Sequence, residues 1–336
     1  MIETIHKPVI LVVGLGSIGK RHVKNLRALF PDAYMVVCRH APTEHDQDFV
    51  TQYIDKVVYD LNEAIALKPM AAILCNPAVY HVSIALQLAK NDIHLFIEKP
   101  LSNTLTDVEA LITLCRQKKL VFMVGYNLRF SKTLDRAREL IKRGAIGDIL
   151  SAQVNTGQYL PDWRPGADYR KTVSAQQKMG GGVLLELSHE LDYMCWLLGK
   201  PVEVFARLTS SGSLEIDVED NADVFLTFQK NLMVSIHLDM LQRTACRQCK
   251  VVGALGTIIW DGVEDKLIVQ SEKQEFSQSF CGAEDKNEMY KREIKHFFDS
   301  IRKGSPAMVT GVDALESLKI VLAARKSNQT REIVPL

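Results

Sequence analysis

The chain has 336 residues, 47% of them hydrophobic and 24% charged, and its 41 lysine and arginine residues nearly balance its 40 aspartate and glutamate residues, leaving a net charge of +1. This composition is typical of a globular protein, and the length suggests about two domains. A nucleic-acid-binding protein would carry a clustered basic excess, and the sequence has none.

The longest apolar run near the amino terminus is Val9–Val13, far shorter than the roughly 18 residues that a membrane span needs. Gly14 and Gly16 follow it at once, without a small-residue cleavage site, so we expect neither a membrane segment nor a signal peptide. The seven cysteines are odd in number and lie mostly in apolar surroundings, which is typical of reduced thiols. We therefore expect a cytoplasmic protein with no membrane or nucleic-acid partner.

Strand-length apolar segments alternate with helical patterns through the first 125 residues. Val9–Val13 predicts a strand, and Ser17–Leu29 has apolar residues at helical spacing and stops before Pro31. The alternation continues through a strand at Tyr34–Cys38, strands at Val57–Tyr59 and Ala71–Cys75, a helix at Val79–Ala89, a strand at His94–Ile97, a helix at Thr106–Arg116 and a strand at Leu120–Val124. Apolar strands separated by helices predict a parallel sheet that is covered on both faces.

After Gly125 the pattern changes to alternating apolar and polar residues. A helix at Lys132–Arg143 is followed by predicted strands at Leu150–Thr156, Val202–Leu208, Val224–Phe228, Leu232–Leu238, Cys249–Val252 and Thr257–Trp260, and then by helices at Met289–Ile301 and Asp313–Ser327. Alternation predicts an antiparallel sheet with one wet or partner-covered face.

We therefore predict an α/β protein. Residues 1–125 should form an N-terminal Rossmann domain with a doubly wound parallel sheet, and residues 126–336 a C-terminal α/β domain with an open, mainly antiparallel sheet for substrate binding and oligomerisation. A sheet with one face left to cover favours a homodimer or homotetramer.

The glycines of the first turn follow a strand and open a helix. In Gly14-Leu-Gly16-Ser-Ile-Gly19 the first glycine permits a tight turn, the second lets the backbone approach a pyrophosphate, and the third permits close helix packing. The helix N-terminus attracts the anion. We predict a dinucleotide site that includes Ser17 and Ile18; the alternative is a tight turn that binds no ligand.

The second strand ends at Cys38 and Arg39, without the carboxylate that binds the ribose 2′-hydroxyl of NAD. Arg39 suits a 2′-phosphate, so NADP is favoured slightly over NAD. The alternative is that Arg39 is a solvated loop residue.

Lys99 follows the fifth predicted strand, at the carboxyl edge where doubly wound sheets bind ligands. Pro100 restricts Lys99 to an extended conformation, which aims the ammonium group. Such a group can donate to a substrate hydroxyl and stabilise an alkoxide.

Three consecutive glycines, Gly180–Gly182, precede a predicted continuous helix. Its core stripe should comprise Leu184, Leu187, Leu191, Met194, Cys195 and Leu198. Its opposite, polar face should comprise Glu186, His189, Glu190 and Tyr193, with Asp192 at the edge. Carboxylates three residues before and after His189 suit an imidazole that exchanges protons, whereas the alternative is a solvated face. The glycines suggest that the backbone passes close to nicotinamide or substrate.

The loop from Tyr159 to Arg170 is rich in aromatic, arginine and aspartate residues, which suit sugar binding. The predicted substrate-binding residues are Trp163, Arg164, Tyr169 and Arg170 of this loop, together with Tyr126, Asn127, Arg129 and Tyr193. The alternative is that the aromatic residues only pack the loop down. Cys246 and Cys249 have no second Cys/His pair at a suitable spacing, so we predict no metal site.

In combination these motifs resemble the Gfo/Idh/MocA family of sugar and cyclitol oxidoreductases, over nearly the whole chain. The segments that carry the resemblance are the glycine turn and its helix, Asn76-Pro77 with His81, Glu98-Lys99-Pro100, the glycine triplet with its His189 helix, and Gly253–Gly256 before Trp260. The loop and the segment Ser188–Tyr193 resemble a branch found in bacterial surface-polysaccharide and nonulosonate biosynthesis, whose members are expected to act on sugars that are often nucleotide-linked.

The resemblance implies that Lys99 contacts the reacting hydroxyl and that His189 exchanges its proton while a hydride moves to or from nicotinamide. It also implies cofactor contacts by Asn76, Pro77, His81 and Glu98, and a cis peptide before Pro100. Many relatives have Asp or Asn four residues before the histidine, where this chain has Leu185. Glu186 or Asp192 then supports His189, or Lys99 and His189 act alone.

The leading hypothesis is an NAD(P)-dependent sugar dehydrogenase or reductase. The alternatives are a regulatory protein that binds NAD(P) without turnover and a redox-neutral enzyme that oxidises its substrate transiently with bound NAD. The presence of both Lys99 and His189 argues against a regulatory protein, which needs no proton relay.

Overall fold

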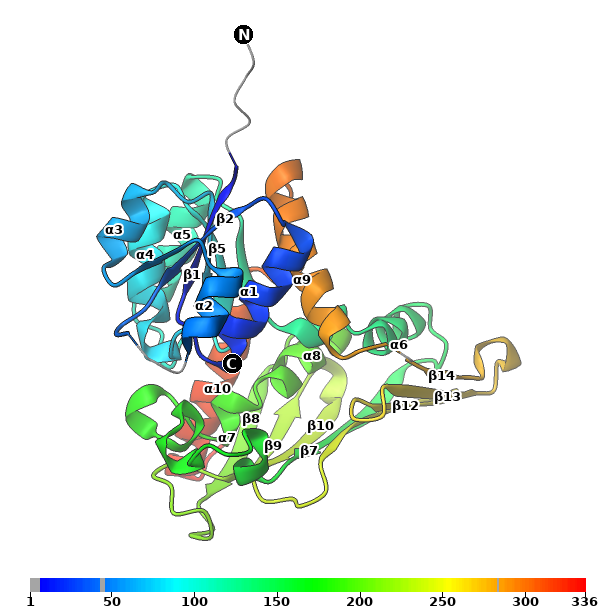
Figure 1. Cartoon of the computed structure of the whole chain (residues 1–336). Coiled ribbons are helices and arrows are strands. Elements are labelled where there is room, and N and C mark those ends of the chain that lie inside the picture. Colours follow the sequence, from blue (N-terminus) through cyan, green and yellow to red (C-terminus); the bar gives the residue numbers. More distant parts are fainter. Residues whose placement is uncertain (1–6, 43–45, 283) are drawn as a thin grey trace. The chain divides into compact units, whose positions relative to one another are not determined.

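The computed structural model describes residues 7–42, 46–282 and 284–336, and the chain divides into two compact units (Figure 1). Unit 1 comprises the residues up to Asn127 together with Lys286–Leu315, and unit 2 comprises Leu128–Asp285 together with Glu316–Leu336. The predicted boundary at residue 125 lies close to Asn127, after which the chain first passes from unit 1 to unit 2. Lys286–Leu315, which the sequence analysis assigned to the second domain, groups with unit 1.

Unit 1 contains a six-stranded parallel sheet in the order β3-β2-β1-β4-β5-β6. Its strands are β1 (Val9–Val13), β2 (Tyr34–Cys38), β3 (Lys56–Val58), β4 (Ala71–Leu74), β5 (His94–Glu98) and β6 (Phe122–Gly125). The central strands are fully buried, as their apolar sequences predict. Strand order reverses between β1 and β4, and ligands of doubly wound sheets bind at the carboxyl ends of the strands beside such a switch point.

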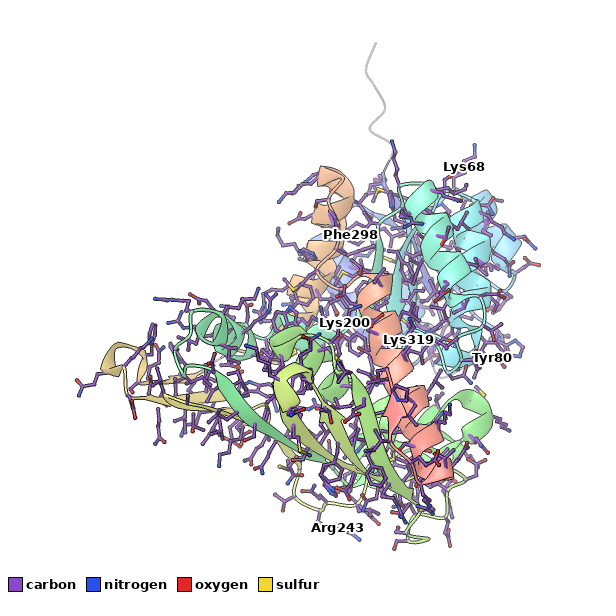
Figure 2. The ribbon with its side chains drawn as sticks, turned by 180° about the vertical axis from the view of Figure 1, so that it is seen from behind. Lys68, Tyr80, Lys200, Arg243, Phe298 and Lys319 are labelled. Atoms are coloured by element: carbon purple, nitrogen blue, oxygen red, sulfur yellow. The ribbon has the colours of Figure 1, made fainter. Side chains whose placement is uncertain are left out.

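The helices of unit 1 cover this sheet. They are α1 (Ser17–Leu29), α2 (Gln47–Tyr53), α3 (Leu61–Ala66), α4 (His81–Lys90), α5 (Val108–Gln117) and α9 (Asn287–Lys303). Helices α4 and α5 lie side by side in Figure 1. Helix α9 belongs here because it packs on α1, where the rings of Phe30 and Phe298 (labelled in Figure 2) are 4.6 Å apart between centroids.

Unit 2 contains a nine-stranded sheet in the order β14-β13-β12-β11-β7-β10-β9-β8-β15. Its strands are β7 (Ile149–Gly157), β8 (Glu203–Thr209), β9 (Asn221–Thr227), β10 (Met233–Asp239), β11 (Cys246–Gly253), β12 (Gly256–Asp261), β13 (Lys266–Ser271), β14 (Gln278–Cys281) and β15 (Val334–Pro335). Strands β7 and β10 pair in parallel and the other neighbours pair antiparallel, which confirms a mainly antiparallel sheet.

Unit 2 also contains α6 (Lys132–Lys142), α7 (Val183–Glu186) and α8 (His189–Leu198), while α10 (Gly311–Thr330) contains residues of both units. Alternate residues of the strands are buried, such as Val224 on β9 and Val234 on β10. Their neighbours on the opposite face include Phe225 and Met233, which are 41% and 57% exposed. The sheet therefore has one open face, as the alternating sequence predicts.

All seven cysteines are free thiols. Burial raises the pKa of six of them: Cys38, Cys75, Cys115, Cys195, Cys246 and Cys249. The seventh, Cys281, is exposed at the end of β14. Among the described residues, no helix has the length and apolar character that crossing a membrane requires.

Candidate functional site

The glycine turn joins β1 to α1, and two of its glycines are required by the fold itself. Gly14 has a φ of +92°, and its N–H donates to the Cys38 carbonyl at 2.9 Å. A Cβ on Gly19 would lie 2.2 Å from the carbonyl oxygen of Gly14, so only glycine lets the helix approach the turn.

Gly16 differs from Gly14 and Gly19 because nothing lies within 4 Å of the place where its Cβ would be. It precedes α1, whose first turn, starting with Ser17 and Ile18, is capped by no side chain. Uncapped N–H groups beside open space suit an anionic ligand, so the turn fits the pyrophosphate of a dinucleotide.

At the end of β2, Arg39 is paired with a carboxylate. Its guanidinium donates to Asp46 Oδ2 at 2.7 Å, and Lys20 of α1 forms an ion pair with the other oxygen of Asp46. The Arg39 and Asp46 side chains are only 10% and 11% exposed. The alternative that Arg39 is a solvated residue is therefore wrong, and its cationic group already has an anionic partner.

Glu98 ends β5 and is almost buried. Its Oε1 lies 2.5 Å from His22 Nε2, and its Oε2 accepts the N–H of Lys99 at 3.1 Å. His22 comes from α1 and is fully buried, edge-on to the ring of Phe96. Lys99 is half-buried, and the Lys99–Pro100 peptide is cis, as the resemblance implied. His22 was not among the predicted site residues, although it lies in the second turn of α1 and on its buried side.

His81 begins α4 and is 1% exposed. Its Nδ1 lies 3.0 Å from the Pro100 carbonyl and its Nε2 lies 2.7 Å from the Asn76 carbonyl. Burial lowers the pKa of His81, while the two carbonyls oppose that shift. Its neighbour Tyr80, labelled in Figure 2, is 50% exposed. His81 thus links two turns at the carboxyl edge of the sheet, whereas the resemblance implied a cofactor contact.

Tyr126, Asn127 and Arg129 are all buried, at 1%, 5% and 4% exposure. Arg129 forms a bidentate pair with Asp192, with distances of 2.8 Å from Nε and 2.7 Å from Nη2. Ser317 Oγ lies 3.4 Å from the same carboxylate. A predicted substrate ligand and a predicted support of His189 are therefore joined in a buried ion pair.

The glycine triplet packs against its own unit. A Cβ on Gly181 would lie 2.4 Å from the Val173 carbonyl oxygen, and a Cβ on Gly182 would lie 2.5 Å from Glu219 Oε1. Glu219 is held in turn by Arg325 at 3.0 Å. Internal contacts therefore explain these glycines, and the expected approach to nicotinamide or substrate is not needed to account for them.

The predicted continuous helix after the triplet is two helices. Helix α7 ends at Glu186 and α8 begins at His189, because Leu187 adopts non-helical angles (φ −101°, ψ 29°). Glu186 and His189 are half-buried, whereas Leu185 is fully buried. Beyond the break, Leu191 and Met194 of the predicted core stripe are buried as expected, but residues of the predicted polar face are buried as well.

Glu190 and Tyr193 show this error directly, since both were placed on the polar face and both are fully buried. Glu190 Oε1 accepts from Thr156 at 3.2 Å and from Arg247 at 2.9 Å, which ties α8 to β7 and β11. The Tyr193 ring packs edge-on against Trp260 at 5.6 Å. Burial raises the pKa of Tyr193 well above its usual value.

The loop after β7 is ordered largely by its own residues. Trp163 donates from Nε1 to the Gln158 carbonyl at 3.0 Å, and Arg170 binds Asp168 at 2.9 Å. Arg243, at the edge of the molecule in Figure 2, lies 3.6 Å from the centroid of the Tyr159 ring. Arg164 is exposed and Tyr169 half-buried. The hydrogen bond from Trp163 to Gln158 supports the alternative that the aromatic residues pack the loop down. The side chain of Arg164 faces solvent.

Among the residues that the structure describes, no group of three or more His, Cys, Asp or Glu side chains could hold a metal ion. Cys249 is buried and lies 3.8 Å from the Met194 sulfur.

Two family models cover nearly the whole chain. The one described as "Oxidoreductase family, NAD-binding Rossmann fold" matches residues 9–126, and the one described as "Oxidoreductase family, C-terminal alpha/beta domain" matches residues 138–336. The chain belongs to the Gfo/Idh/MocA oxidoreductase family. The resemblance stated from the motifs is thereby confirmed, as is the α/β fold.

Relatives of this family member include the myo-inositol 2-dehydrogenase of Thermotoga maritima, which is 27% identical over 97% of this chain and 97% of its own. Levoglucosan dehydrogenase in complex with NADH and levoglucosan has a TM-score of 0.87 at 20% identity, covering 98% of this chain and 99% of that one. The WlbA dehydrogenase of Bordetella pertussis, in complex with NADH and UDP-GlcNAcA, has a TM-score of 0.82 at 21% identity, covering 98% and 99%. The two structural matches show that the fold is shared.

Proposed function

We propose that this family member transfers a hydride between a nicotinamide cofactor and a hydroxyl-bearing or keto carbon of a sugar, free or nucleotide-linked. The observation that carries the proposal is the combination, in unit 1, of an open, uncapped glycine turn with a lysine fixed at the carboxyl end of β5. Two relatives have names that specify a substrate, myo-inositol 2-dehydrogenase and levoglucosan dehydrogenase, and these names support a polyhydroxylated substrate.

The cofactor would be held by the amides that follow Gly16, with predicted contacts from Asn76, Pro77 and Glu98. When bound, it supplies the hydride acceptor or donor. Lys99 donates a hydrogen bond to the reacting oxygen and stabilises its developing negative charge. His189 takes the hydroxyl proton in oxidation and returns it in reduction.

For the supporting group we favour Glu186 over Asp192. Both oxygens of Asp192 are bonded by Arg129, and a carboxylate committed to a buried guanidinium is poorly suited to a second partner that changes charge. Glu186 is half-buried and lies on the short helix directly before His189.

We propose NAD(H) as the preferred cofactor, against the slight preference for NADP that Arg39 suggested. A 2′-phosphate at the end of β2 would have to displace Asp46 from both Arg39 and Lys20. The Asp46 carboxylate would instead accept from a ribose hydroxyl. Replacing Asp46 by Ala should raise the ratio of kcat/KM for NADP to that for NAD by about tenfold or more, as expected for the loss of one repulsive contact. Arg39→Leu is the matched control and should lower the same ratio.

The assay that tests the reaction follows nicotinamide absorbance after NAD⁺ or NADP⁺ is added with a panel of cyclitols, free sugars and nucleotide-linked sugars. A rise with one sugar class supports the proposal. A flat trace, while nucleotide binding is demonstrated by titration, would favour the regulatory or the redox-neutral alternative. Product formation without net reduced nicotinamide separates these two.

For the quaternary structure we propose a homodimer or homotetramer that covers the open sheet face of unit 2. Phe225 and Met233 are large, apolar and exposed on neighbouring strands of that face. Phe225→Glu should therefore lower the mass measured by light scattering, whereas a wild-type protein that elutes as a monomer would contradict the proposal.

A further inference from the structure

The backbone is hydrogen-bonded on both sides of Lys99. On one side, the Lys99 N–H donates to Glu98 Oε2 at 3.1 Å. On the other side, the carbonyl of Pro100 lies 3.0 Å from His81 Nδ1. A long side chain is aimed reliably only when the backbone that carries it is fixed.

On the Glu98 side, a histidine of α1 binds the carboxylate. His22 is fully buried on α1, and its Nε2 lies 2.5 Å from Glu98 Oε1. Gly125 of the neighbouring strand β6 makes room for the carboxylate, because a Cβ there would lie 3.1 Å from Glu98 Oε2. A buried carboxylate with a bonded partner for each oxygen is held in one position.

The Pro100 side is tied to a different strand connection. His81 Nε2 lies 2.7 Å from the Asn76 carbonyl, and Asn76 follows β4. The imidazole therefore lies between the turns after β4 and after β5, and in its neutral form its single N–H donates to one of the two carbonyls. Its 1% exposure excludes direct contact with a substrate in the described conformation.

We propose that His22, through Glu98, and His81 are positioning residues that together fix the backbone of Lys99. The inference rests on the proposed role of Lys99. Under this proposal His81 contacts only protein groups, and neither His22 nor His81 exchanges a proton with the substrate. Since a misplacement of about 1 Å can cost about a hundredfold in rate, loosening either side should lower kcat by about tenfold to a hundredfold.

The test is a double-mutant cycle with Lys99. His81→Leu removes one side of the support, and Gly125→Ala presses on Glu98 without removing any polar group. In the wild-type background each should lower kcat by a larger factor than it changes the dissociation constant for NADH. In a Lys99→Ala background each should change the residual kcat less than about twofold, because coupled residues are not additive.

His94→Leu is the matched control. His94 lies at the opposite end of β5, where its Nδ1 accepts the Val121 N–H at 2.9 Å, and its loss should leave kcat unchanged. An equal fall in kcat with and without Lys99 would overturn the inference. If His81→Leu does not fold, the Gly125→Ala cycle alone decides. An unchanged kcat for Lys99→Ala itself would instead overturn the proposed function.

Discussion

The two glycine-rich turns of the chain look alike in sequence but differ in what surrounds them. At Gly16 of the first turn, an added Cβ would enter open space. At Gly182 of the second turn, with a φ of +106°, it would meet the Glu219 carboxylate at 2.5 Å. Both turns were expected to bring backbone close to a ligand, and only the first leaves space for one. A run of glycines therefore indicates close approach, while the contacts decide whether a ligand or the protein itself approaches.

The largest expected effect concerns the two proposed catalytic residues, Lys99 of unit 1 and His189 of unit 2. Lys99→Ala and His189→Gln should each lower kcat by about 10²–10⁴-fold, as is usual for a lost acid–base or oxyanion-stabilising group. Nucleotide binding, measured by titration with NADH, should persist in both. Lys68→Ala, a change at an exposed residue of unit 1 (Figure 2), is the control. A His189→Gln variant with normal kcat would remove unit 2 from the proposed chemistry.

The second expected effect concerns Asp192, which follows the second turn. Asp192→Asn leaves the Arg129 charge buried without its anionic partner and should lower the free energy of unfolding by about 3–5 kcal/mol. Asp168→Asn weakens an exposed pair with Arg170 and should leave the free energy of unfolding nearly unchanged. Urea denaturation measures both. A stable Asp192→Asn variant with a strongly reduced kcat would restore the sequence-based role of Asp192 beside His189.

The two glycines themselves give the direct test. Gly182→Ala should destabilise the protein by about 1–3 kcal/mol, since the methyl group overpacks a left-handed position. Gly16→Ala should leave the unfolding free energy nearly unchanged and weaken nucleotide binding, because its methyl group projects into the space assigned to the pyrophosphate. If Gly16→Ala binds NADH normally, the assignment of the first turn is wrong.

The smallest expected effect is a dependence of stability on pH. Burial lowers the pKa of His81, His94 and His296 in unit 1 below the usual value of 6.5. The unfolded chain therefore binds more protons than the folded one as the pH falls below about 6.5, and stability decreases on acidification. The Tm should drop by a few degrees between pH 7.5 and 5.5, and His94→Asn should reduce that drop. A Tm that rises as the pH is lowered from 7.5 to 5.5 would contradict the lowered pKa values of these histidines.

The strands were predictable because burial and alternation are local properties of the sequence. All six strands of the parallel sheet were predicted within a few residues. The site at Gly16 and Lys99 stays a prediction. Some elements were missed: β13, β14 and β15 of the unit 2 sheet were not predicted, nor were α2 and α3, whose 7 and 6 residues are too few for a helical period to show.

Longer-range features were not predictable for a different reason. The helix breaks at Leu187, and Glu190 and Tyr193 beyond the break are buried, so the polar face assigned to them was wrong. The pairs His22–Glu98 and Arg129–Asp192 join residues 76 and 63 positions apart, which no periodicity reveals.

The distribution of the free thiols has a practical consequence. A maleimide reacts with thiolate. Cys38, Cys115 and Cys249 are buried, Cys75, Cys195 and Cys246 are partly buried, and burial raises the pKa of all six. The exposed Cys281 is therefore the preferred attachment point for a fluorophore in the wild-type protein, without any engineered cysteine. A dye placed there, on the outermost strand at one edge of the unit 2 sheet, would report the assembly of subunits by energy transfer between differently labelled chains.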